Sequence, residues 1–403
     1  MANQLLTINM ITNEALAVLE NQLTAAKYIN RQYDDSFGRS GAKIGDTLNI
    51  RKPPRYIGRT GQAISIEDSV ETSVPLALTT QRGVDIQFSS SDLALRIDQF
   101  SERFIKPAMV QVANAIDLDV LILMKNTTWN SVGVPGTALT SGDILLDAGA
   151  LLDDNATPRG DLRSAVFGAR SSANVIKGLK SIFNDGKRIS DQYNTGNLGP
   201  LYGFKTSMDQ NVIKHIVGPL GGTPLVNGAN QTGNSLVTDG WTAAAANRLK
   251  KGDVFTIAGV FAVNPVSRQT TTQLQQFVVT SDVNSDAAGN ATIPIAPAIT
   301  PTGQFQNVTV GPADNAALTI VGTSGAVTEQ NVAFHRDAFT LACADLPLPG
   351  GVDMAARKSD PQTGLSVRAV RAYNITTDQF PLRLDILYGI AALYPEWSCR
   401  IQA

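Results

Sequence analysis

Side chains that carry acid–base, nucleophilic or metal chemistry are few and scattered along the 403 residues of this chain. Its two histidines, His215 and His335, have neither a cysteine nor a second histidine near them in the sequence. A metal site or a nucleophile–base pair needs several such groups at defined spacings. The short motifs of hydrolases, metalloproteases and nucleotide-binding loops are also missing from the sequence. We therefore predict no catalytic, cofactor-binding or metal-binding residues, and a protein that is not an enzyme.

Two acidic groups carry a weak chemical signature. The pair Asp153–Asp154 stands at the end of an expected helix, which predicts a solvated helix terminus rather than an acid–base pair. The run from Asp282 to Gly289 places oxygen-bearing side chains at the first, third and fifth positions of a calcium-binding loop. Its glycine comes two residues late, however, and Ile293 occupies the position where such a loop has glutamate. Because Asx and glycine residues favour turns, this run predicts a polar hairpin turn.

Composition excludes several further classes of protein. Cys343 and Cys399 are too few for a disulfide framework, and we expect two free, buried thiols in a reducing compartment. The net charge is −2 with no dense lysine or arginine cluster, so a strong phosphate-binding surface is not expected. The N-terminal sequence lacks the features of a signal peptide, and no apolar run approaches the roughly 18 residues of a membrane span. We expect a soluble protein.

The first structural element that the sequence predicts is an N-terminal helix. Between Thr12 and Tyr33, Leu16, Leu19 and Leu23 recur at helical spacing. Such a helix cannot bury its apolar stripe alone, so it must lie on the rest of the chain or on a neighbour.

An extended arm is predicted next, between Gly45 and Phe88. Residues 47–51 and 84–88 alternate as half-buried strands do, and a polar stretch rich in proline and glycine separates them. This pattern predicts a long two-stranded arm with a mobile tip. Because an isolated hairpin is marginal in water, the arm should rest on another surface.

The rest of the chain predicts a mixed fold with an inserted β domain. A long helix is expected over 91–124, with a kink or break at Pro107, and two shorter helices begin near Ser141 and Ser171. From 217 to 326 the sequence is rich in Gly, Thr, Val, Asn and Pro, with short alternating strands and no helical stripe. Strands are expected again at 365–373 and 382–394.

The stretch from Lys250 to Pro297 carries a family likeness. It reads Lys-Lys-Gly-Asp-Val-Phe-Thr-Ile-Ala-Gly-Val, then Asn-Pro, then Gln-Phe-Val-Val-Thr, and then Asp-Ala-Ala-Gly-Asn-Ala-Thr-Ile-Pro-Ile-Ala-Pro. This order resembles the inserted β-barrel domain of the coat proteins of Salmonella-type podoviruses. That domain interrupts the HK-97-type capsid fold shared by tailed-phage heads, and the order of the other expected elements fits the same plan.

The resemblance implies an α+β chain of the HK-97 type with an inserted small β-barrel. Its expected parts are an N-terminal arm (1–44), an extended β-hairpin loop (45–90), a spine helix with peripheral domain (91–139), an axial domain (140–216), the barrel (217–326) and a return to the axial and peripheral domains (327–403).

The resemblance also implies a function and a set of partners. The chain would be a subunit of an icosahedral shell, assembling into pentamers and hexamers around packaged double-stranded DNA, which its inner surface would meet without sequence specificity. It would act with a separate scaffolding protein and a portal, be assembled in the host cytoplasm and reside in the virion capsid, with no cofactor and no membrane. The candidate contacts between subunits lie in the arm and the loop: Leu16, Leu19, Leu23, Arg51, Arg55, Tyr56, Arg59, Glu67 and Asp68.

A second hypothesis comes from a different class. The Thr/Asn/Gly-rich region 217–326 also suits a recognition module of a secreted or virion-associated β-rich adhesion protein. The lack of a signal peptide and the amphipathic N-terminal helix favour shell assembly over this reading.

Overall fold

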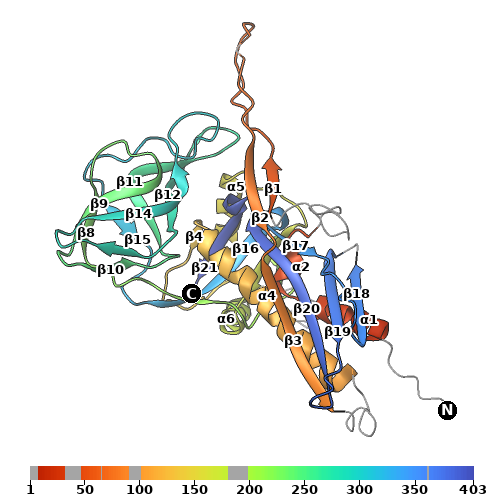
Figure 1. The fold of residues 1–403 in the computed structure, drawn as a ribbon. Coiled ribbons are helices and arrows are strands. Elements are labelled where there is room, and N and C mark those ends of the chain that lie inside the picture. Colours follow the sequence, from red (N-terminus) through yellow and green to blue (C-terminus); the bar gives the residue numbers. More distant parts are fainter. Residues whose placement is uncertain (1–7, 32–46, 65, 90–100, 180–197, 361–362) are drawn as a thin grey trace. The chain divides into compact units, whose positions relative to one another are not determined.

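The computed structural model describes residues 8–31, 47–64, 66–89, 101–179, 198–360 and 363–403. Helices and strands are both abundant, which confirms the expected α+β class. The chain forms two compact units, and each is built from three separate stretches of sequence (Figure 1). Unit 1 contains 1–50, 73–120 and 339–393, and unit 2 contains 51–72, 121–338 and 394–403.

Unit 1 is organised by a five-stranded antiparallel sheet around its longest strand, β20. On one side β20 pairs with β17 and β19, and β19 pairs in turn with β18. On the other side it pairs with β3 along ten consecutive residues, from Gln379↔Ser89 to Tyr388↔Thr80. Leu382, Leu384 and Ile386 alternate into the core, as half-buried strands require. The strand bounds are β3 Thr80–Ser89, β17 Phe339–Ala344, β18 Met354–Asp360, β19 Leu365–Arg371 and β20 Gln379–Ala392.

The N-terminal helical segment packs against this sheet. It consists of α1 (Ile8–Gln22) and the single turn α2 (Ala25–Tyr28), and α1 lies on β18 and β19. Asp117 holds the start of α2, because its carboxylate accepts the backbone amides of Thr24 and Ala26 at 2.8 Å each. An anion at a helix N-terminus satisfies amides that have no partner within the helix.

The predicted spine helix is present as α4 (Lys106–Thr127), and residues 91–100 of the expected span lie outside the described residues. The interruption expected at Pro107 takes the form of a π-helical turn, η1 (Ser101–Ile105), directly before α4. Pro107 itself sits in the first helical turn, where a missing amide hydrogen does no harm.

By length and composition alone, helix 102–127 could cross a membrane, so the prediction that no apolar run approaches the length of a membrane span is wrong on this criterion. Half of its most apolar window is nevertheless buried inside the protein, and Ile116 and Met124 are fully buried. We read it as the core helix of the fold.

The extended arm pairs differently from the prediction. Strand β1 (Thr47–Lys52) pairs with β2 (Thr72–Ala77), whereas the predicted partner near 84–88 is part of β3 and pairs with β20. Alternation showed that both segments are strands, but it carries no information on which strand lies beside which. The two-stranded part is therefore short, and residues 53–64 and 66–71 belong to an extended loop without regular structure.

Unit 2 contains a host domain built on a mixed six-stranded sheet. The strand order is β4-β21-β16-β5-β6, with β7 pairing a second segment of β16. Helix α5 and helix α6 supply apolar side chains to the core on this sheet, where Leu145, Leu152, Phe167, Phe204 and Ile401 are buried together. The bounds are β4 Ser131–Val132, α5 Ile144–Asp154, β5 Arg163–Phe167, α6 Ala169–Leu179, β6 Lys205–Met208, β7 Lys214–Ile216, β16 Val327–His335, η2 Arg336–Ala338, η3 Pro395–Trp397 and β21 Ser398–Gln402.

The inserted domain is a closed β-barrel, as expected. Its main sheet runs β15-β11-β12-β14-β9-β8, and the amide of Val226 donates to the carbonyl of Ala316 at 2.9 Å, which joins the two ends of the sheet. Phe255, Phe277 and Ile293 are fully buried inside it. The bounds are β8 Gly222–Val226, β9 Gly233–Trp241, β10 Ala246–Leu249, β11 Val254–Val263, β12 Thr270–Val279, β13 Val283–Ser285, β14 Ala291–Ile299 and β15 Leu318–Ile320.

Buried polar contacts join the barrel to the host domain within unit 2. The Asp253 carboxylate accepts His215 Nε2 at 2.7 Å and the Gly218 amide at 3.1 Å, so it binds the strand that leads into the insertion. From the host sheet, the fully buried Arg400 donates to the carbonyl of Gly252 at 2.7 Å. Burial lowers the pKa of Arg400 to about 10, and the nearby Asp253 charge opposes that shift.

Candidate subunit-contact surfaces

The extended loop 51–72 is held in shape by polar bonds between its two limbs. The carboxylate of Glu67 accepts the backbone amides of Ile57 at 2.7 Å and Gly58 at 2.8 Å. The hydroxyl groups of Tyr56 and Ser69 lie 3.1 Å apart. These contacts join residues 56–58 of the outgoing limb to residues 67–69 of the returning limb, so this part of the loop has a defined shape without a strand ladder.

A cluster of charged and aromatic side chains fixes the base of the loop in unit 2. The guanidinium of Arg55 donates to Glu396 Oε1 at 2.8 Å. The ammonium of Lys52 lies 4.9 Å from the ring centre of Tyr394, which stacks on Trp397 at 4.2 Å. Burial lowers the pKa of Lys52, and the charge of Glu396 opposes the shift. The base of the loop is therefore anchored, and the tip beyond the base is exposed to solvent.

The predicted contact residues of the loop have several roles. Arg55 and Glu67 are engaged within the chain as described, and the carbonyl of Asp68 accepts the side-chain amide of Gln304. Arg51 is exposed and 3.6 Å from Glu71. The other two are Tyr56 and Arg59, which are both exposed, and Arg59 donates to the nearby carbonyl of Gly61. Whether any of them touches another subunit stays a prediction.

The three leucines of the N-terminal helix are placed inside unit 1. Leu16, Leu19 and Leu23 are all buried by their own chain. A side chain enclosed in this way has no surface left for a second subunit, so the burial gives no support to their predicted contact role. Leu16 and Leu19 lie on the buried face of α1, and Leu23 directly follows its end, where the helix predicted for 12–33 is interrupted before α2.

The apolar side chains at the loop tip were not among the residues predicted to form contacts. Ile64 is 83% exposed and Ile66 is 89% exposed, and Ile57 and Val70 are also exposed. The available signal was the presence of isoleucines inside a stretch that is otherwise polar. Exposed apolar residues gathered on one segment are typical of an interaction surface.

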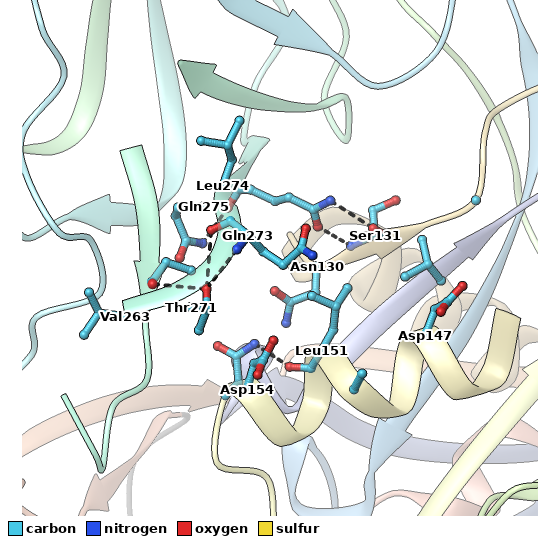
Figure 2. Close-up of a pocket in the computed structure, with 16 residues that line it drawn as sticks. Asn130, Ser131, Asp147, Leu151, Asp154, Val263, Thr271, Gln273, Leu274 and Gln275 are labelled. Atoms are coloured by element: carbon cyan, nitrogen blue, oxygen red, sulfur yellow. Dashed lines mark hydrogen bonds between the residues drawn. The ribbon is translucent and has the colours of Figure 1, made fainter. Parts of the chain in front are cut away.

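A polar cleft lies between helix α5 and the barrel strand β12 within unit 2 (Figure 2). Its volume is about 340 Å³. Figure 2 shows Asp147 and Asp154 on the same side of α5, with Leu151 between them and Gln273 opposite. Asp147 and Asp154 are the charged side chains of the lining, and both are acidic. From the sequence, Asp154 was predicted only to be part of a solvated helix terminus.

Gln276 connects the two walls of this cleft. Its side-chain oxygen accepts the backbone amide of Ser131 at 2.5 Å, and its side-chain nitrogen donates to the carbonyl of Ser131 at 2.9 Å. The amide thus completes the free edge of β4 as a neighbouring strand would.

The weak chemical motifs have structural roles. Asp286 accepts the backbone amides of Ala288 and Asn290 at 2.9 and 2.7 Å, so the predicted polar turn is present at 286–290, whereas residues 283–285 of the same run form strand β13. Within the described ranges, no group of three or more His, Cys, Asp or Glu side chains is placed to hold a metal ion. Cys343 and Cys399 are both free and buried, and burial raises the pKa of the Cys343 thiol to about 12.

A family comparison covers almost the whole chain. The family model described as "P22 coat protein - gene protein 5" matches residues 1–399. No curated protein matches the sequence.

Solved structures give weaker likenesses. A structure titled "Mycobacterium phage Che8" has a TM-score of 0.48 and 11% identity, and the alignment covers 94% of this chain and 90% of that chain. "Capsid of Ralstonia phage GP4" has a TM-score of 0.47 and 6% identity, covering 94% and 88%. "Asymmetric unit of bacteriophage PhiM1 mature capsid" has a TM-score of 0.43 and 11% identity, covering 93% and 87%.

Proposed function

Since the chain belongs to the P22 coat protein family and is a tailed-phage major capsid protein, we propose that it assembles into the pentamers and hexamers of an icosahedral shell around packaged double-stranded DNA. Its work is then structural and depends on the surfaces that each copy offers to its neighbours. A closed shell requires one surface to meet a different surface on the next copy, at an angle that allows closure.

The exposed tip of the loop 51–72 carries this proposal. The base of the loop is anchored by the Arg55–Glu396 ion pair, while Ile64 and Ile66 present nearly all of their surface to solvent. An anchored loop with apolar side chains at its tip suits a segment that lies over an adjacent subunit.

The strength of such a contact fits reversible assembly. Burying one isoleucine side chain contributes about 1.5–3 kcal/mol. Ordering and desolvation on association offset much of this gain, so a single contact of a few side chains stays weak. Misplaced subunits are then able to leave, and the closed shell is stabilised by the number of its contacts.

The partners of the shell follow from the same proposal. A separate scaffolding protein and a portal would direct assembly in the host cytoplasm. The net charge of −2 and the lack of a dense basic cluster suit an inner surface that meets DNA without holding it tightly. The barrel, joined to the host domain through Asp253 and Arg400, would brace that domain within the shell.

The test is electron microscopy of the chain expressed together with the neighbouring reading frames of its genome. We expect uniform spherical shells. Small oligomers alone under every condition, including co-expression with a scaffold candidate, would contradict the proposal.

A further inference from the structure

We propose that the cleft between α5 and β12 receives the cationic limb 51–59 of the loop from a second copy of this chain, with Arg59 lying between Asp147 and Asp154. The inference rests on the proposed function and names the surface that the loop would meet on its neighbour.

The acidic residues of the cleft form one face of a helix. Asp147 and Asp154 are seven residues apart on α5, which is two helical turns and roughly 10 Å. Ala150 and Leu151 lie between them and complete the floor of the cleft. Both carboxylates therefore flank one apolar strip, an arrangement that suits a side chain with an apolar stem and a cationic head.

The described part of the chain supplies no cation to either carboxylate. Among the residues that the structure describes, Asp147 and Asp154 take part in no ion pair, whereas the adjacent Asp153 binds both Arg159 and Arg163. Burial raises the pKa of Asp154, and the charge of Asp153 adds to the shift. The ionised form of Asp154 is thus disfavoured in the isolated chain, and a guanidinium entering the cleft would stabilise this carboxylate.

The opposite wall of the cleft is an open strand edge. Strand β12 pairs with β14 only at Val278 and Val279, although β12 begins at Thr270. The part of β12 that lines the cleft consists of Thr271, Gln273, Leu274, Gln275 and Gln276, and Gln273 is the exposed glutamine among them. An open edge with amide side chains is able to take hydrogen bonds from an extended segment. The volume of about 340 Å³ lies within the roughly 300–1,000 Å³ of typical ligand pockets.

The loop limb has the complementary charge and form. Four of the nine residues from Arg51 to Arg59 are cationic, and two prolines favour an extended backbone. Arg55 is paired with Glu396, and Lys52 lies over Tyr394. Arg59 is exposed and donates to a backbone carbonyl of its own loop, and within the described ranges it forms no ion pair, so its charge is available to a neighbour.

A charge-exchange experiment tests the proposal. The cleft variant Asp147→Lys/Asp154→Lys and the loop variant Arg59→Glu should each lower the yield of shells at least tenfold. The combined variant should recover to within about threefold of the wild type, because both charges are then exchanged. Asp161→Lys is the matched control, since Asp161 is an exposed acid of the same unit outside the cleft. It should assemble as the wild type does.

Folding of each variant is checked by its urea unfolding transition. If the lysine variant fails to fold, Asp147→Asn/Asp154→Asn replaces it and should still lower the shell yield several-fold. Wild-type yield with a reversed or neutral cleft would overturn the inference, and so would a cleft defect that Arg59→Glu does not rescue, which would assign the cleft to another cationic partner. In both cases the proposed function would still hold if the wild-type protein forms shells and their yield depends on the loop tip. If the wild-type protein never forms shells, the proposed function itself is wrong.

Discussion

Gln276 binds the backbone of Ser131 with both ends of its side-chain amide, so a barrel residue takes the place of a strand beside the host sheet. Replacing it with alanine removes two hydrogen bonds from a buried peptide group. We expect Gln276→Ala to lower the free energy of unfolding by about 1–3 kcal/mol in urea denaturation. Gln273→Ala is the control, because Gln273 is exposed on the same strand and should change stability by no more than about 0.5 kcal/mol. Equal effects of the two variants would show that the amide contact contributes nothing.

Asp253→Ala should be more damaging. The carboxylate is almost fully buried and accepts His215 Nε2 and the backbone amides of Gly218 and Lys250. Its removal leaves these donors without an acceptor, so we expect a loss of about 3–5 kcal/mol in unfolding free energy. The exposed Asp282 accepts one backbone amide, and Asp282→Ala should cost at most about 1 kcal/mol. A loss under 1 kcal/mol for Asp253→Ala would refute the account of the barrel joint.

The ion pair at the base of the loop is testable by proteolysis. Arg55→Ala should release the base while the rest of unit 2 stays folded, because the pair is only partly buried. A contribution of about 1 kcal/mol corresponds to roughly fivefold faster cleavage within residues 51–72. Glu396→Gln should give a similar increase, and the double variant should add little to either single change. Fully additive effects would mean that the two side chains act independently.

Ile64→Ser/Ile66→Ser separates assembly from folding. Both side chains are exposed in the single chain, so the unfolding free energy should change by no more than about 0.5 kcal/mol. The yield of shells, measured by sedimentation, should fall at least tenfold because the apolar contact with a neighbour is lost. Val266→Ser provides a control with similar exposure on the barrel and should leave the yield unchanged. Normal shell yield from the isoleucine variant would contradict the role given to the loop tip.

The buried thiol of Cys343 makes the stability of the fold depend on pH. Burial raises the pKa of Cys343 from an ordinary value of 9.0 to about 12. The folded state therefore keeps the proton that the unfolded state releases, so this contribution to stability is complete below pH 9 and is lost between about pH 9 and 12. At pH 8 a thiol reagent should label the folded wild-type protein far more slowly than the urea-unfolded chain. Rapid labelling of Cys343 without unfolding would show that the thiol is accessible.

Local patterns predicted most of the elements of this fold. The spacing of the leucines located α1, the alternation near 84–88 located β3, and both C-terminal strands appear as β19 and β20. Each of these elements has one buried face, and a buried face leaves a period in the sequence. The change in composition near 217 likewise marked the barrel strands.

Pairings between distant segments could not be predicted in the same way. Strand β3 pairs with β20 across about three hundred residues, and no feature of residues 80–89 specifies that partner. The cleft shows the same limit, because its walls come from α5 and from β12. The seven-residue spacing of Asp147 and Asp154 was visible, but the open strand edge opposite them was not. The exposure of Ile64 and Ile66 also depends on what the folded chain leaves uncovered.

The position of β21 in the host sheet determines how late in synthesis that sheet can be completed. Residues 398–402 lie between β4 and β16, so the two halves of that sheet have no direct pairing without them. On the ribosome this strand is translated after all of its neighbours. The sheet of unit 2 is therefore completed only once these residues have emerged from the exit tunnel, and a nascent chain cannot present a finished subunit before then.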